Sequence, residues 1–172
     1  MRSRVLISAF ALALTGAITS CEDEITSVGE GLNETADWRA DLDASQETAA
    51  PNLTGASNPA GRAWFIDNGN ELTYYMEWSG LTSNVTGAHI HRAPVGESGN
   101  IIVPLTVVAR TSGTVAGFID MTVSDVAVGT GTGTETVSPD SLRTLLNNGN
   151  AYVNIHTTTN PGGEIRGQIR RN

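Results

Sequence analysis

The chain has no lysine and only one cysteine among its 172 residues. All ten basic residues are therefore arginines, and they face 18 acidic residues, which gives a net charge of −8. An acidic chain without a basic stripe repels phosphate backbones, so nucleic acid is excluded as a partner. The single cysteine, Cys21, excludes an internal disulfide and offers no thiolate pair for a metal site.

Long apolar runs are also scarce, and the one at residues 5–14 is too short for a membrane span, which needs about 20 residues. It follows two arginines and precedes small residues, an order typical of an export signal. Residues 18–21 (ITSC) resemble the lipobox of bacterial lipoproteins, whose cysteine is lipidated. We therefore expect a lipoprotein signal peptide over residues 1–20 and lipidation of Cys21; the alternative is an ordinary cleavage site beside an unmodified cysteine.

Residues 21–35 are acidic and contain glycine, which predicts a flexible tether between lipid and domain. The acidic run at residues 22–24 resembles signals that send some lipoproteins to the cell surface, although solubility explains it equally well. The expected location is the cell envelope, where the lipid anchors the protein to a bacterial membrane. The outer membrane and the cell surface are among the expected positions. Besides that membrane, the expected partners are an envelope or extracellular protein or a glycan.

From residue 38 onward the hydrophobic period is two, which predicts strands, and one domain is expected over residues 36–172. In residues 71–80, large apolar side chains at even positions alternate with more polar ones, as in a half-buried strand. The turn DNGN at residues 67–70 joins this strand to the preceding one in a hairpin. Strands are predicted at residues 38–42, 61–67, 71–80, 87–91, 101–108, 113–122, 151–157 and 164–170.

One short helix is predicted near residues 139–148. Ser138 is a suitable N-cap, Pro139 suits the first helical position, and Gly149 suits the C-terminal stop. The Gly/Thr-rich residues 128–137 before it predict a surface loop. Many short strands with a single helix are typical of an all-β antiparallel fold, here a Greek-key-like β-sandwich or barrel.

The chain has three histidines, and two of them, His89 and His91, lie one residue apart. Alternation along a strand places both side chains on one face, with their Cα atoms roughly 6.5 to 7 Å apart. Two imidazoles at this separation can converge on one metal ion.

The third histidine, His156, lies in the predicted hairpin of residues 151–170. Burying Val153 and Ile155 together with Ile165 and Ile169 requires odd positions to pair with odd ones, since a slip of one residue exchanges the faces. The side chains at even positions then lie on the face opposite the core, as His89 and His91 do. These positions are Tyr152, Asn154, His156, Glu164, Arg166 and Gln168. His156 is thus expected near Glu164.

Three interpretations of this polar face stay open. It is the wet side of the sheet, or a hydrogen-bonded corner in which the histidines and Asn154 hold loops in place, or a Zn or Cu site. In the metal site, His89, His91 and His156 are the ligands. Glu164 is then a fourth ligand or a hydrogen-bond partner of a ligand, and Arg166 and Asn154 complete the surroundings or a binding face.

Residues 88–105 (AHIHRAPVGESGNIIVPL) and residues 151–169 (AYVNIHTTTNPGGEIRGQI) resemble the CHRD domain, a module named after chordin and found in many bacterial secreted proteins and lipoproteins. Weaker matches extend the resemblance over nearly all of residues 36–172. It implies an all-β extracellular module whose biochemical activity is not well defined.

The His-x-His strand with a later histidine also looks like the copper-binding pattern of Cu/Zn superoxide dismutases, which are Greek-key β-barrels. The chain departs from that family because it lacks the disulfide cysteines, the bridging ligand and the further histidines of a two-metal site. No nucleophile motif is recognisable either, so no catalytic residue is assigned. The sequence favours a lipid-anchored binding or structural module; the alternative is a mononuclear Cu or Zn protein, distantly similar to the dismutases.

Overall fold

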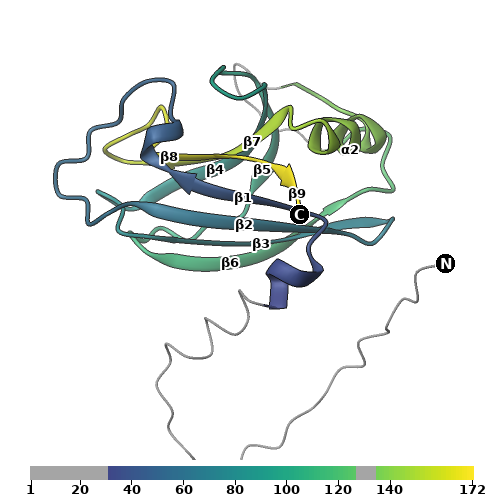
Figure 1. The fold of residues 1–172 in the computed structure, drawn as a ribbon, viewed down its shortest axis with the longest axis horizontal. Coiled ribbons are helices and arrows are strands. Elements are labelled where there is room, and N and C mark those ends of the chain that lie inside the picture. The colour runs from purple at the N-terminus through teal and green to yellow at the C-terminus, as the bar shows by residue number, and fades with distance from the viewer. Residues whose placement is uncertain (1–30, 127–134) are drawn as a thin grey trace, which may run out of the picture.

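The computed structural model describes residues 31–126 and 135–172. These form one antiparallel sheet with the strand order β5-β4-β7-β8-β1-β2-β3-β6, and a short β9 pairs with β1 (Figure 1). The sheet curls into a nearly closed barrel, and the connections from β3 to β4, β5 to β6 and β6 to β7 join strands that are not neighbours. The prediction of an all-β antiparallel fold with Greek-key-like connections is confirmed. The strands are β1 (Trp38–Asp43), β2 (Ala60–Asp67), β3 (Glu71–Ser79), β4 (Val85–Arg92), β5 (Ile101–Leu105), β6 (Gly113–Asp120), β7 (Ala151–Thr157), β8 (Ile165–Gln168) and β9 (Arg170–Arg171).

The predicted strands lie close to the observed ones, and most of their ends differ by at most two residues. Two differences are larger. β5 ends at Leu105, before the predicted residue 108, and the last predicted strand is divided into β8 and β9. The hairpin turn between β2 and β3 is as predicted: Gly69 has a φ of 87°, and its amide donates to Asp67 Oδ1 at 2.8 Å. Glycine adopts this left-handed conformation without steric cost.

The predicted helix is α2 (Pro139–Asn147). The Ser138 side chain accepts a hydrogen bond from the Ser141 amide, Pro139 opens the first turn, and Gly149 has a φ of 65° just beyond the end. Its buried residues Leu142 and Leu146 join the barrel core, so the helix covers one end of the barrel (Figure 1). No helix in the described parts of the chain is long and apolar enough to cross a membrane.

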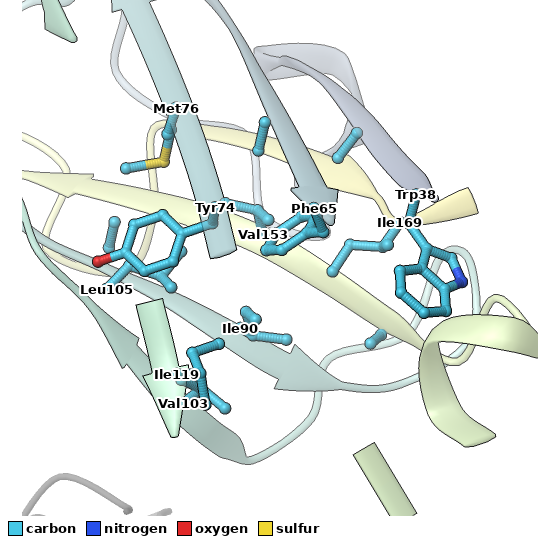
Figure 2. Packing of buried hydrophobic residues seen from close by; sticks show 14 of the residues in the cluster. Trp38, Phe65, Tyr74, Met76, Ile90, Val103, Leu105, Ile119, Val153 and Ile169 are labelled. Carbon is cyan, nitrogen blue, oxygen red and sulfur yellow. The ribbon is translucent and has the colours of Figure 1, made fainter. Parts of the chain in front are cut away.

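The hydrophobic core lies inside the barrel. The side chains at the even positions of β3 point into it, as the alternation predicted. Leu72, Tyr74, Met76 and Trp78 are all at most 3% exposed. Figure 2 shows Tyr74 and Met76 directed into the same core as Ile90 and Val153, which come from the opposite half of the sheet.

The Tyr74 hydroxyl also accepts a hydrogen bond of 2.8 Å from the Thr106 amide, directly after β5. Since β5 is one end of the strand order and β3 lies beside the other, this bond helps to close the barrel.

The segment that precedes β1 contacts the domain more closely than a flexible tether does. Residues 31–35 form a helical turn, and Asn33 Oδ1 accepts a hydrogen bond of 2.7 Å from the indole of Trp64. Residues before 36 thus contact β2, and Trp64 is only 1% exposed. The predicted signal peptide, Cys21 as the predicted lipidation site, and residues 128–134 of the predicted Gly/Thr loop lie outside the described residues.

Candidate metal centre

Two strand pairs bring the histidines together. β7 pairs with β8 so that Val153 faces Gly167 and Ile155 faces Ile165, and β4 pairs with β7 so that His89 faces Asn154. Odd positions thus pair with odd ones across the hairpin, as burial of the apolar side chains required. All three histidines project from the face opposite the hydrophobic core, which confirms the parity argument.

The three imidazole rings form a compact cluster. Their centroids are 5.0 Å apart for His89 and His156, 5.7 Å for His89 and His91, and 6.0 Å for His91 and His156. One nitrogen of each ring lies within 4.8 Å of the other two. Around an ion with bonds of about 2.0–2.1 Å, tetrahedrally placed nitrogens are about 3.4 Å apart, so closure needs shifts of roughly 1.5 Å at most.

Backbone carbonyls orient two of the rings. His91 Nδ1 lies 3.0 Å from Gly99 O, and His156 Nδ1 lies 3.0 Å from Pro161 O. Because a carbonyl only accepts, each Nδ1 must donate its proton, and the Nε2 atom of each ring keeps its lone pair. A ligand histidine in a metal site is held in the same way by its second nitrogen.

The third ring, His89, lies over a glycine. A Cβ added at Gly87 would come within 3.3 Å of His89 Cε1, so the missing side chain leaves room for the ring. His89 Nδ1, His91 Nε2 and His156 Nε2 are all buried and have no hydrogen-bond partner among the described residues. Each ring therefore presents one unsatisfied nitrogen, which is the feature expected of ligands to a shared ion.

The protonation state of the cluster suits metal binding. Burial is the main cause that lowers the pKa of His89 to about 4, and the neighbouring His156 and His91 add to the effect. Burial likewise lowers the pKa of His91 to about 4 against the opposing hydrogen bond to Gly99, and it lowers the pKa of His156. All three imidazoles are thus neutral at pH 7, the form that coordinates metals.

The polar face around the histidines is buried rather than wet. Tyr152, one of the even positions predicted on this face, is 3% exposed and stacks on the His91 ring at 4.8 Å with an interplanar angle of 11°. The Arg166 guanidinium lies 3.4 Å above the other face of the tyrosine ring. Arg166 is itself only 2% exposed, and the wet-side interpretation of this face is wrong.

Asn154 contacts an acidic residue that the sequence reasoning missed. Its Nδ2 atom donates to both carboxylate oxygens of Glu47, at 3.0 and 3.2 Å, while its Oδ1 atom is buried without a partner. Burial raises the pKa of Glu47 to about 7, although the Asn154 hydrogen bond and the charge of Arg166 act in the opposite direction. Glu47 follows a short 3-10 helix, η1 (Ala44–Gln46), so strand parity carried no signal for it.

Glu164, expected as a fourth ligand or a partner of a ligand, is engaged elsewhere. Its carboxylate accepts hydrogen bonds from the Thr82 amide and hydroxyl, from Thr157 Oγ1 at 2.6 Å, and from Asn160 Nδ2 at 2.9 Å. The hydroxyl of Thr157 belongs to an odd position, so this carboxylate turns away from the histidine face. The potential ligands grouped with the cluster are the three histidines.

A surface cavity of about 610 Å³ lies elsewhere, over β2, β3 and β6. A smaller cavity of about 200 Å³ lies between residues 47–51 and residues 159–163. Its lining includes Glu47 and Pro161, whose atoms contact Asn154 and His156 respectively. Another cavity, of about 510 Å³, is lined by Gly99, whose carbonyl oxygen contacts His91, and by Pro94, whose carbonyl oxygen accepts from Arg166. Two cavities thus border residues that contact the histidine cluster.

The residues that position this cluster belong to two segments, 88–105 and 151–169, which also carry the family resemblance. A family model of the CHRD domain matches residues 38–169 and includes both segments. The chain belongs to the CHRD domain family. Searches of curated proteins and of solved structures found no significant match. Membership of this family and the barrel-like fold indicate a binding or structural module.

Proposed function

We propose that this CHRD domain binds one Zn or Cu ion through His89, His91 and His156. The observation that carries the proposal is that each of the three histidines brings a ring nitrogen within 4.8 Å of the other two, and each ring has a buried nitrogen without a hydrogen-bond partner. A buried polar atom without a hydrogen bond costs folding free energy, so three such atoms in one place need an explanation. A shared metal ion satisfies all three at once.

The donor set favours these two metals. Imidazole nitrogen suits Zn and Cu, whereas Ca and Mg take oxygen ligands. The Nδ1 hydrogen bonds of His91 and His156 hold two of the donors in one orientation, which limits the entropy lost when an ion binds.

Titration of the purified protein with Zn²⁺ and Cu²⁺ tests the proposal. We expect one ion per chain by elemental analysis after dialysis, with calorimetric saturation at the same ratio. A variant with all three histidines replaced by alanine is the control for binding elsewhere on this acidic chain. Equal uptake by the variant, or none by the original chain, overturns the proposal.

A second candidate function has one specific observation in its favour. Two of the histidines bond to the carbonyls of Gly99 and Pro161, which belong to the loops after β4 and β7. In this structural alternative the cluster only fixes the loops of a module whose partner binds elsewhere. It predicts that neither metal raises the melting temperature of the protein.

The location of the module is also a proposal. A basic start, a short apolar run and the ITSC sequence ending at Cys21 support export followed by lipid anchoring in the cell envelope. We expect Cys21→Ser to move the protein from the membrane fraction to the soluble fraction of a bacterial host. Membrane partitioning that is unchanged in this variant contradicts the lipid anchor.

A substitution at Gly99 tests whether the hydrogen bond from His91 Nδ1 to the Gly99 carbonyl orients His91 for metal binding. A Cβ at this position would collide with the carbonyl oxygen of Arg92, so Gly99→Ala must move the loop that accepts the His91 proton. We expect metal affinity to fall about 10- to 100-fold, as is typical when such an outer partner is lost. Metal titration measures the effect.

Gly162→Ala is the matched control, since a Cβ there has open space in the corresponding loop near His156. An unchanged affinity in Gly99→Ala would show that the hydrogen bond to Gly99 does not position His91 for binding.

A further inference from the structure

The next inference rests on the proposed function and concerns the part of the coordination sphere that the protein leaves open. The three histidines are neutral ligands, and the group of potential ligands in the described residues includes no carboxylate or thiolate beside them. A divalent ion held there would keep its full charge and would have three protein ligands. Zn²⁺ sites with three protein ligands take the fourth ligand from solution.

A second positive charge is linked to the cluster through Tyr152, whose ring stacks on His91 at 4.8 Å and has the Arg166 guanidinium 3.4 Å from its centroid. Arg166 is 2% exposed, and within the described residues it forms no ion pair. Its hydrogen bonds are long ones, of 3.4 Å to Pro94 O and 3.5 Å to Gln168 Oε1. A buried guanidinium without a carboxylate partner is costly, and its charge favours an anion nearby.

The carboxyl groups near the cluster do not compensate these charges by contact. Glu47 forms its hydrogen bonds with Asn154, and Glu164 is held by Thr82, Thr157 and Asn160. His89 and His156 are only half buried, so the cluster is not sealed from solvent. The cavity of about 200 Å³ is lined by Pro161, whose carbonyl oxygen lies 3.0 Å from His156 Nδ1, so it borders the surroundings of the cluster.

We propose that the fourth coordination position of the bound ion takes a small anion from solution, in a site whose positive charge Arg166 increases. We expect this position to accept compact monovalent anions that donate a lone pair to the metal, such as hydroxide, azide or a halide. Such a centre belongs with open metal sites, where the protein ligands fix the ion and the exogenous ligand exchanges.

The experiment uses the full chain loaded with one equivalent of Cu²⁺ and titrated with sodium azide. We expect a new charge-transfer absorption band that saturates at one azide per copper. A loaded protein whose spectrum does not respond to azide overturns this inference and leaves the metal site intact. Failure to load any copper overturns both proposals, so the two failures are distinguishable.

The contribution of Arg166 is tested with Arg166→Gln, which removes the charge and keeps a polar planar group. We expect azide binding to weaken about tenfold, with copper still bound. Arg92→Gln is the matched control, because Arg92 is exposed and already paired with Glu135. Equal azide affinity in both variants overturns the role of Arg166.

Discussion

Replacing His91 by alanine is expected to lower the affinity for Zn²⁺ or Cu²⁺ by more than about 100-fold. Loss of an outer hydrogen-bond partner of a metal ligand already costs 10- to 100-fold, and this substitution removes a ligand together with its partner contact to Gly99. The two remaining histidines cannot hold the ion alone at comparable affinity. Competition with a chelator of known affinity measures the change.

Thermal unfolding separates a lost ligand from a damaged fold. A ligand that binds only the folded state stabilises it by about 4 kcal/mol at a free concentration 1,000 times its Kd, so metal should raise the melting temperature of the original chain. That increase should vanish in His91→Ala and persist in Phe118→Ala, which removes a ring that is 65% exposed on β6. An increase of equal size in all three proteins would contradict the assignment of His91 as a ligand.

The fold was predictable where side chains alternate between core and solvent. β3 illustrates this, because its even positions are large and apolar, and its turn to β2 carries a glycine with a positive φ. The order of the strands was not predictable, since β4 lies beside β5 and β7 for reasons of long-range packing that no local pattern encodes. The contact between the Trp64 indole on β2 and Asn33, 31 residues earlier, was not predictable for the same reason.

The histidine cluster was predictable in part. Parity placed the three imidazoles on one face, but only the pairing of β4 with β7 brings His156 beside the other two. The same reasoning misplaced Glu164, because it lies just before β8, where strand alternation no longer fixes the side-chain direction. Glu47 was missed because it contacts Asn154 from a loop more than 100 residues away. The presence of three histidines predicted a possible metal site, but tertiary contacts determine which other side chains lie beside them.

Replacement of Glu164 is expected to cause the largest loss of stability in the chain. The carboxylate is fully buried and accepts four hydrogen bonds that join the loop after β3, the end of β7 and the loop between β7 and β8. Glu164→Ala leaves these donors without an acceptor, and each unsatisfied buried donor costs about 1–3 kcal/mol. We expect a loss of at least about 3 kcal/mol in the free energy of unfolding, measured in urea. Glu97→Ala, in an exposed loop, is the control and should change stability little.

The pH dependence of the stability lost on replacing Glu164 shows whether the ionised carboxylate is the cause. Burial alone raises the pKa of Glu164, but the hydrogen bonds from Thr157, Thr82 and Asn160 outweigh it and hold the pKa below its usual value of 4.5. The folded protein therefore favours the ionised form. Its stabilising contribution is complete above pH 4.5 and is lost as the pH falls through the lower folded value. Glu164→Gln is almost the same size but turns an amide N–H toward donors, so it should be destabilised at pH 7 and approach the original chain in strong acid. A stability difference that stays constant from pH 7 to strong acid would show that packing, and not the buried charge with its hydrogen bonds, explains the role of Glu164.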